Sequence, residues 1–397
     1  MDPLETVSDA ETANDHGPVS TQAAARLQQR ASNDLRRGEP IILTSQEGDD
    51  AWLILPLEMA TAEDWLAWQT MLGPDTQPAL LLSGERSSLL GLEPVPNLLP
   101  LRDRTGQKPI AAGDLPGMLA NLQRQAGLAS ARQQNEGALV DQASSASPLM
   151  MSAIRLLKRA FLLPAALAWP LRPTQFQTMV GAGVMTLDQP PAPEQPPPSV
   201  PILKLSAAPV PLVGAEHTRI SVYRDPVTGR DINVIEIGSS RDGSMATPPL
   251  VRIHAACFTG DLLNSLKCDC GDQLKGAVKL MSEGEGGLIL YMPQEGRDIG
   301  MANKMRSYAL QATGVDTVDA NLVLGFAVDE RDYSSAGDIL RHMGHDRIRL
   351  LTNNPDKVAS MEHRGVMVSE RVGHKFPPNP HSLAYMESKR RRTGHDL

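Results

Sequence analysis

Three cysteines lie close together in the second half of the chain and are the residues best suited to chemistry. Cys257 is followed by ten residues and then by the pair Cys268 and Cys270. Thiolates grouped in this way are typical zinc ligands, and a site with three protein ligands leaves the fourth position for water, as catalytic zinc sites do. Two alternatives stay open: His254 could complete a closed structural site, or the cysteines could simply be buried. Three cysteines do not make a disulfide framework, so we expect a reducing, cytoplasmic location.

Two polar segments further along could bind an anion. Residues 294–297 read QEGR, in which Gly296 permits a sharp turn and Arg297 could fork onto a phosphate. Residues 352–357 read TNNPDK and should open a helix, whose free N–H groups, together with Lys357, would favour an anion. An ordinary turn and an ordinary helix cap would explain the same residues. The charged run at 329–332 reads by itself as a solvated loop.

Alternating strands and helices must position these segments. The apolar and polar patterns predict strands at 250–253, 287–292, 347–351 and 366–368, and helices at 273–283, 300–312, 336–343 and 355–364. Such alternation predicts an α/β or α+β fold for the second half.

The first half carries a weaker α/β pattern. We expect a helix from Thr21 through Leu35, strands at 41–43, 52–55 and 80–83, a helix that starts after Thr61, a loop at 128–147 and a buried or amphipathic helix over 148–171. Ten residues at 189–198 are mostly proline and should form an extended spacer. The predicted organisation is therefore a disordered tail at 1–20, a smaller α/β domain with a helical extension at 21–185, a linker at 186–203 and a second domain at 204–397.

The composition indicates a globular protein. Of the 397 residues, 41% are hydrophobic and 21% are charged, and the net charge is −8. This charge argues against a general nucleic-acid coat or a polybasic membrane binder, so we expect neither nucleic acid nor membrane as a partner. The most apolar stretch, 148–171, is interrupted by Arg155, Lys158 and Arg159, and no membrane span is expected. The acidic N-terminus does not read as a secretory signal.

Taken together, the motifs of the second half resemble GTP cyclohydrolase II, the first enzyme of riboflavin biosynthesis. The resemblance runs from about residue 205 to near the C-terminus, close to half of the chain. It is carried by Arg252-Ile253-His254, Cys257 with Thr259-Gly260-Asp261, the run 265–271 with Gln273-Leu274, the run 294–297 with Ile299-Gly300 and Asn303-Lys304, and the runs 308–311, 316–318, 320–321, 324–326, 329–333 and 349–355.

The resemblance implies a zinc-dependent homodimer that uses Mg²⁺ and GTP. Such an enzyme opens the imidazole ring of guanine and releases formate, pyrophosphate and 2,5-diamino-6-(ribosylamino)-4(3H)-pyrimidinone 5′-phosphate. By position, Cys257, Cys268 and Cys270 would hold zinc, Arg331 would attack the α-phosphate, and Asp329 would accept a proton. The residues that would bind GTP are Arg252, Ile253, His254, Gln273, Glu295, Gly296, Arg297, Tyr308, Thr317, Thr352 and Lys357.

This chain departs from the family pattern at two places. The family usually reads HSEC before the first zinc ligand, whereas this chain reads HAAC with Ala255 and Ala256, and it has Pro293 where the family often has arginine. The missing carboxylate favours a second interpretation, a relative with altered chemistry such as those of pyrimidine catabolism. A third interpretation is a nucleotide-binding protein without catalysis.

The first half more faintly resembles dihydroxybutanone phosphate synthase. The resemblance rests on residues 35–43, 82–86 and 90–92. That family has an acidic stretch with an arginine after its first strand, whereas residues 45–50 read SQEGDD. The resemblance therefore implies a degenerate domain without synthase activity, with a role in folding or dimerisation.

Overall fold

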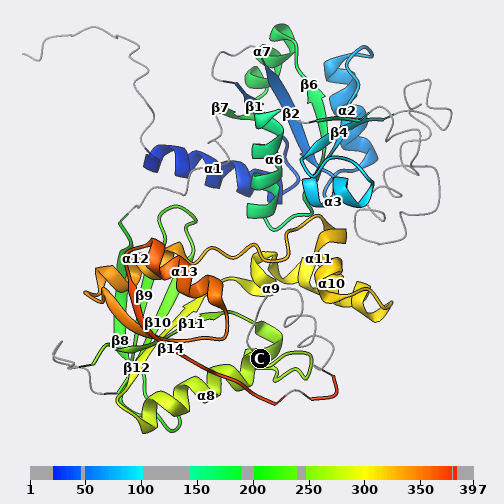
Figure 1. The fold of residues 1–397 in the computed structure, drawn as a ribbon. Coiled ribbons are helices and arrows are strands. Elements are labelled where there is room, and N and C mark those ends of the chain that lie inside the picture. Colours follow the sequence, from blue (N-terminus) through cyan, green and yellow to red (C-terminus); the bar gives the residue numbers. More distant parts are fainter. Residues whose placement is uncertain are drawn as a thin grey trace, which may run out of the picture.

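The computed structural model describes residues 21–45, 50–101, 143–145, 147–188, 201–238, 247–377 and 379–381. Two seven-stranded sheets organise these residues, one in each half of the chain (Figure 1). The predicted tail at 1–20, nearly all of the predicted loop at 128–147 and the proline-rich run lie outside the described residues. In the described part of the chain, the helices are too short or too polar to span a lipid bilayer.

The first sheet is almost entirely antiparallel, with the strand order β5-β4-β3-β6-β2-β1-β7 and one parallel pair, β1 with β7. Its elements are α1 (Thr21–Arg36), β1 (Ile41–Thr44), β2 (Ala51–Pro56), α2 (Ala62–Leu72), β3 (Ala79–Leu82), α3 (Gly84–Leu89), β4 (Asn97–Pro100), β5 (Ser144–Ser145), α6 (Pro148–Arg159), β6 (Ala165–Pro170), α7 (Pro173–Gly181) and β7 (Met185–Asp188). The predicted helix from Thr21, the strands at 41–43, 52–55 and 80–83 and the helix after Thr61 are confirmed. At the start of α2, Thr61 and Asp64 form a capping box.

The predicted helix over 148–171 is wrong in its second part. Helix α6 ends at Arg159, and Phe161 then takes a left-handed φ of 59°. The chain re-enters the sheet as β6, which pairs with both β2 and β3. An apolar run such as AALAW suits a fully buried central strand as well as a helix, so periodicity alone does not separate the two.

The predicted linker at 186–203 also begins too early. Strand β7 runs to Asp188 and pairs with β1 in parallel register. Leu187 is buried among the residues of this sheet's second core cluster. The boundary between the halves therefore lies after Asp188.

The second sheet combines a parallel part and an antiparallel part in the order β14-β13-β11-β12-β10-β9-β8. Its strands are β8 (Leu203–Pro209), β9 (Thr218–Arg224), β10 (Asp231–Ile237), β11 (Leu250–Ala255), β12 (Gly287–Met292), β13 (Arg347–Leu351) and β14 (Met367–Val372). The helices are α8 (Cys270–Glu283), α9 (Glu295–Asp298), α10 (Gly300–Ala312), α11 (Thr317–Leu324), α12 (Ser334–His342) and α13 (Pro355–His363). The mixed α/β fold is confirmed, and each strand and helix predicted for this half is present.

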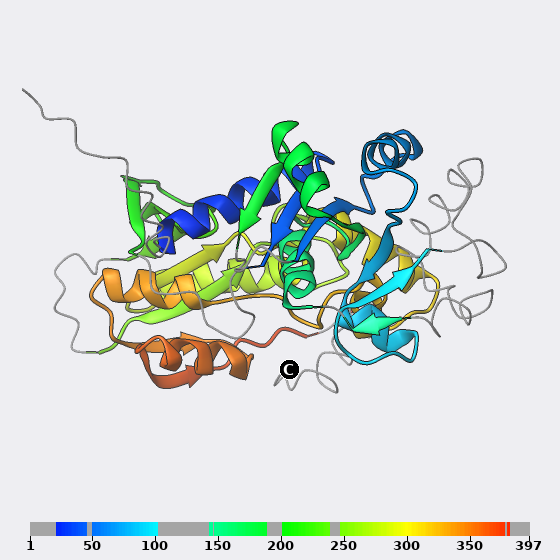
Figure 2. The same cartoon turned by 90° about the horizontal axis from the view of Figure 1, so that it is seen from above.

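Helices cover both faces of this second sheet. Ala277 and Met281 of α8 pack on one face with Ile289 of β12. On the other face, Ile339 of α12 and Met361 of α13 pack over the central strands. Figures 1 and 2 show α8 on the opposite side of the sheet from α12 and α13. The ends of β11, β12 and β13 are thereby held rigidly at one edge.

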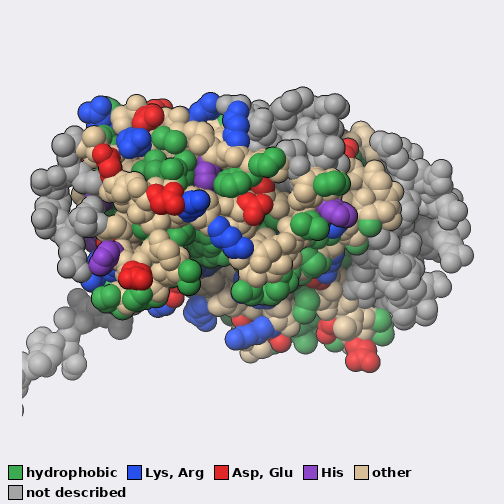
Figure 3. All heavy atoms as spheres, turned by 90° about the horizontal axis from the view of Figure 1, so that it is seen from below, with side chains coloured by type: hydrophobic (Ala, Val, Ile, Leu, Met, Phe, Trp, Pro, Cys, Tyr) green, Lys and Arg blue, Asp and Glu red, His purple; other side chains and the backbone are tan. Residues whose placement is uncertain are grey.

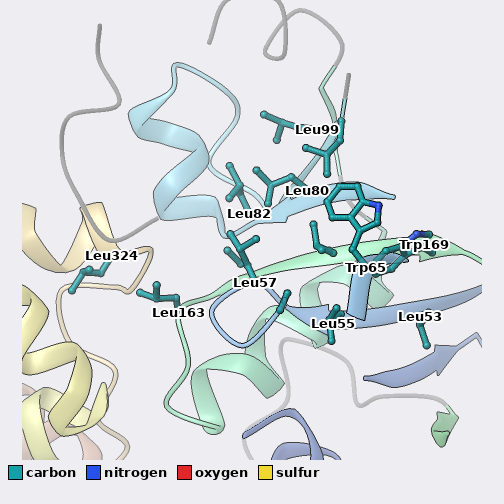
Figure 4. Packing of buried hydrophobic residues seen from close by; sticks show 14 of the residues in the cluster. Leu53, Leu55, Leu57, Trp65, Leu80, Leu82, Leu99, Leu163, Trp169 and Leu324 are labelled. Carbon is teal, nitrogen blue, oxygen red and sulfur yellow. The ribbon is translucent and has the colours of Figure 1, made fainter. Parts of the chain in front are cut away.

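Helices α10 and α11 pack away from their own sheet and against the first half. Leu310, Val323, Leu324 and Phe326 belong to the same buried cluster as the core of the first sheet. Figure 4 shows Leu324 of α11 facing Leu163, which precedes β6. The two halves, predicted as separate domains, thus share a hydrophobic core.

Polar contacts fasten the same boundary. The Ser83 hydroxyl donates to the Gly325 carbonyl at 2.7 Å, and Arg306 forms an ion pair with Glu58 at 2.8 Å. Gly325 has a φ of 89°, and a Cβ there would lie 2.9 Å from the Pro164 side chain. Glycine at this position therefore permits both the turn after α11 and the close approach of the halves.

Candidate active site around three cysteines

The three cysteine side chains converge at the end of β11. Cys257 follows this strand and caps a π-helical turn, Phe258–Leu262, while Cys268 and Cys270 lie at the start of α8. Their Sγ atoms all lie within 4.8 Å of one another, and those of Cys257 and Cys268 are 3.7 Å apart. A Cβ on Gly260 would stand 2.9 Å from the Cys268 Sγ, so only glycine leaves room behind the cluster. Three convergent thiols with free space around them fit a zinc ion.

His254 is not part of this ligand group among the described residues. Its Nε2 faces both carboxylate oxygens of Asp261 at 3.1 Å, and its Nδ1 accepts a hydrogen bond from Arg252. The ring also stacks on Tyr291, with centroids 5.5 Å apart. Because both ring nitrogens are engaged by protein groups, the closed site with His254 as the fourth ligand is not formed.

Asp261 organises the backbone beside the cluster. Its carboxylate accepts from the Cys257 amide at 2.9 Å, from the Tyr291 hydroxyl at 3.0 Å and contacts His254. The side chain is only 7% exposed. Three contacts on one buried carboxylate fix the direction in which Cys257 leaves β11.

We expect Asp261→Asn to lower zinc affinity about 10–100-fold, as removal of supporting groups around a metal typically does. The amide loses acceptor capacity and would leave at least one of its buried partners unsatisfied. Competition with a chromogenic chelator measures the affinity. Asp272→Asn, an exposed position in the first turn of α8, is the matched control. Equal zinc affinity in the two variants would contradict the role of Asp261.

Lys304 brings positive charge to the thiols. Its Nζ lies 3.1 Å from the Cys257 Sγ, 2.9 Å from the Thr259 hydroxyl and 2.7 Å from the Glu295 carboxylate. Hydrogen bonds from Cys268 and Cys270, together with Lys304, hold the pKa of the Cys257 thiol well below its ordinary value. Glu295 also accepts from the Phe258 amide at 2.6 Å. A carboxylate therefore lies beside the cluster, although Ala256 replaces the one that the family carries.

The thiols line a pocket of about 150 Å³. The predicted site residues that line it are Arg252, His254, Cys257, Cys268, Cys270, Gln273, Gly296, Arg297, Tyr308, Thr317, Arg331, Thr352 and Lys357. The pocket thus joins side chains from the ends of β11, β12 and β13 with those of α10 and α11. Ala255 and Ala256 also line it.

Three predicted residues act from behind this lining. The Ile253 carbonyl accepts from the Lys357 Nζ at 2.7 Å. Glu295 holds Lys304, as described above, and Asp329 forms an ion pair with Arg331. These residues do not line the pocket themselves but contact side chains that do.

A left-handed turn presents Arg297 as the motif predicts. Gly296, Arg297 and Asp298 have φ values of 64°, 63° and 69°. Since left-handed backbone is uncommon for residues other than glycine, neighbouring contacts must hold this turn. Arg297 donates to the Val328 carbonyl at 3.0 Å, and its own carbonyl accepts from the Glu330 amide at 3.2 Å. The turn is therefore tied to the loop that carries Asp329 and Arg331.

The charged run 329–332 is not a solvated loop, contrary to its reading in isolation. The Arg331 Nε donates to the Asp329 carboxylate at 2.8 Å. Burial alone would raise the pKa of Asp329, but the contact with Arg331 outweighs burial, so this pKa is lowered. Glu330 forms an ion pair at 2.7 Å with Lys158 of the first half. The run is partly buried because the first half packs against it.

Cations meet at the other side of the pocket, where the sheet ends. Arg252 is 5% exposed and donates to the Gln273 side chain at 2.6 Å, and burial lowers its pKa to about 10. Lys357 lies in the first turn of α13, whose N-cap is Asn354. The predicted anion site at this helix start thus combines a helix N-terminus with two buried cations.

Sequence reasoning missed several residues of the pocket. On α10, Lys304, Ser307, Tyr308 and Gln311 share one helix face, and of these only Tyr308 was predicted. Their i, i+3, i+4 and i+7 spacing was the available signal. Ile299 and Asn321 were missed as well, whereas Gln294, Asn353 and Asn354 lie in the two segments predicted to bind an anion.

Comparison with known proteins finds a matching family for the second half of the chain. The model of the family described as GTP cyclohydrolase II matches residues 204–373. GTP cyclohydrolase-2 of Azospirillum brasilense is 46% identical over 192 residues, which cover 48% of this chain and 49% of that protein. The riboflavin biosynthesis protein RibBA of Cytophaga hutchinsonii is 47% identical over 150 residues, 38% of this chain and 37% of that protein. The match thus spans about half or less of these two relatives.

A solved structure similar to the chain is a two-domain 3,4-dihydroxy-2-butanone 4-phosphate synthase from A. baumannii. It covers 88% of this chain and 99% of its own, at 15% identity and a TM-score of 0.29. A likeness of this strength decides nothing about the first half, so its resemblance to a synthase stays a prediction.

A shorter relative is covered almost completely. GTP cyclohydrolase-2 of Pseudomonas syringae pv. tomato is 41% identical over 196 residues, which cover 49% of this chain and 94% of that protein. The family match over residues 204–373 includes the residues that build the thiol-lined pocket. The chain therefore belongs to the GTP cyclohydrolase II family.

Proposed function

We propose that this chain is a zinc-dependent GTP cyclohydrolase II, which converts GTP into formate, pyrophosphate and the 2,5-diaminopyrimidinone ribosyl phosphate. The observation that carries the proposal is the pocket, which is lined both by three convergent thiols and by several cationic side chains. A purine carbon to be hydrolysed and a triphosphate to be bound require those two features side by side.

The cations suit the triphosphate of GTP. Arg252, Arg297, Arg331 and Lys357 all line the pocket. One guanidinium group can bind two phosphate oxygens, and Mg²⁺ would neutralise part of the charge of the phosphates in the proposed complex. Together they would bind the phosphates, and the base would face the thiols.

Unsatisfied polar atoms in the pocket suit the guanine. The Gln294 Oε1 and the Asn354 Nδ2 are buried and have no hydrogen-bond partner among the described residues. Buried polar atoms of this kind usually meet a ligand or an ordered water. An acceptor and a donor are the complements of the N1–H and O6 groups of guanine.

Zinc bound by Cys257, Cys268 and Cys270 would lower the pKa of a water molecule and supply hydroxide near neutral pH. The protein groups around it keep the site in place: Asp261 fixes the Cys257 backbone, and Lys304 stabilises the thiolate form of Cys257. Tyr308 lies over this region, with its ring 5.7 Å from the Lys304 Nζ.

Arg331 and Asp329 would act at the phosphates. The family assigns the attack on the α-phosphate to the arginine, but a guanidinium with a pKa above about 12 is a poor nucleophile. In this structure Asp329 holds the Arg331 guanidinium by its Nε and Nη2 atoms. This geometry supports stabilisation of phosphate charge by an oriented cation. The proposal also includes a homodimer and a reducing, cytoplasmic location, where three free thiols would stay reduced.

Incubation of the zinc-loaded protein with GTP and Mg²⁺ tests the function. We expect formate, pyrophosphate and the diaminopyrimidine in equal amounts, because Glu295 keeps a carboxylate beside the cluster in spite of Ala256. Pyrophosphate without formate would instead indicate altered chemistry on the zinc side, which the Ala255-Ala256 pair favours as the second candidate. Absence of all three products would contradict catalysis on GTP.

A further inference from the structure

A second cavity, of about 600 Å³, lies between the two halves of the chain. Its walls are α1 and α6 of the first half, the turn between β9 and β10, and the segments around Asp298 and 330–332. It shares no lining residue with the thiol pocket. Figure 1 shows α1 and α6 above this boundary and the loops of the second half below it.

The side chains that line the cavity include more basic than acidic groups, although the chain is acidic. Five cationic side chains line it (Arg36, Arg155, Lys158, Arg159 and Arg230), against three carboxylates (Asp298, Glu330 and Asp332). The chain as a whole carries a net charge of −8. On the face seen in Figure 3, by contrast, basic and acidic side chains are interspersed. An excess of positive charge gathered in a concave site attracts anions.

Two of the cations are already matched by carboxylates. Lys158 contacts Glu85 at 2.8 Å and Glu330 at 2.7 Å, and Arg230 binds Asp298 through both of its Nη atoms. These pairs leave little charge at Lys158 and Arg230 to attract a ligand.

Arg159 and Arg36 are bonded instead to neutral groups in the described part of the chain. Arg159 donates to the Gln28 side chain and, at 3.3 Å, to the Val227 carbonyl. Arg36 donates to the Ala160 carbonyl at 3.1 Å and lies 5.6 Å from the centre of the Phe161 ring. Burial lowers the pKa of Arg159, and the field of Asp225 opposes this only in part. Among the described residues, the positive charge at these two arginines is thus not offset by a bonded carboxylate.

We propose that this cavity binds a phosphate ester of nucleotide size or smaller, with Arg36 and Arg159 as its anion ligands. Guanidinium groups bind phosphate oxygens in a fork geometry, which makes arginine the usual choice for such ligands. The volume lies within the range of small-molecule sites, about 300–1,000 Å³, and boundaries between domains are common places for them. Leu156 and Leu187 in the lining would contact the apolar part of the ligand.

Calorimetric titration of the full chain with ribose 5-phosphate tests the proposal. We expect Arg159→Gln and Arg36→Gln each to weaken binding about tenfold or more, as loss of a charged hydrogen bond to phosphate does. Arg36 is exposed, so its substitution leaves the fold intact even if Arg159→Gln does not. Urea unfolding checks both variants. Arg219→Gln, an exposed arginine near the start of β9, removes the same charge far from the cavity and should bind like the wild type.

Lys357→Gln separates the cavity from the thiol pocket. Ribose 5-phosphate should bind this variant as it binds the wild type if the cavity is the site. A loss of binding in Lys357→Gln together with unchanged binding in Arg36→Gln would place the sugar phosphate in the thiol pocket and overturn the proposal. No binding to the wild type would overturn it as well. None of these outcomes depends on turnover of GTP.

Discussion

Replacing Cys268 by serine is expected to abolish both zinc binding and GTP turnover. The Cys268 Sγ lies 3.7 Å from that of Cys257 in a group of three, so its loss leaves two thiols, too few to hold a catalytic zinc. Bound zinc would lower the pKa of a water molecule to about 7, and without it we expect the rate to fall about a thousandfold or more. Metal analysis and formate release measure the two effects.

Ser282→Ala is the control for this experiment. Ser282 lies near the end of α8, and its exposed hydroxyl donates to the Lys279 carbonyl of the same helix. This variant should keep one zinc per chain and full turnover. Unchanged formate release in Cys268→Ser would exclude a catalytic role of the cluster. Lost zinc with retained turnover would show that the metal is structural.

Replacing Phe326 by alanine is expected to cost about 3–5 kcal/mol of unfolding free energy, the usual range for a fully buried aromatic side chain. Phe326 is 0% exposed, and it belongs to the cluster that includes residues of both halves, such as Leu57 and Leu310. The cavity left behind cannot close easily, because the Ser83–Gly325 hydrogen bond fixes the backbone beside it. Urea unfolding of the full chain measures the change.

Phe258→Ala provides the comparison for residue type. Phe258 is 49% exposed in the π-helical turn, so the same substitution removes far less buried surface. We expect its cost to be well below that of Phe326→Ala. Equal costs would mean that the core common to the two halves contributes little to stability.

The thiol pocket could be predicted largely from the sequence because its signals are local. Cys257, Cys268 and Cys270 lie within one short segment, and Gly296 marks the turn that presents Arg297. Each of these depends on residue type and on spacing of a few positions. The exclusion of His254 could not be predicted, since it depends on the directions in which the side chains of Asp261 and Arg252 point, which residue type and spacing do not determine.

The arrangement of the halves could not be predicted, because its contacts join residues far apart in the chain. Lys158 and Glu330 form an ion pair across 172 positions, and Ser83 and Gly325 bond across 242. The helix predicted beyond Arg159 failed for the same reason. Its apolar residues instead form β6, which pairs with β2 and β3, and no local pattern reveals the positions of those two strands.

The common core also bears on how the chain can change over time. Helices α10 and α11 carry Tyr308 and Thr317 on one side and pack on the first half with the other. A substitution at Leu57 or Leu163 therefore alters the support of pocket residues that it never touches. Selection on the pocket acts on the first half as well. A domain that had lost its own chemistry would still be retained, because it supports the helices of its neighbour.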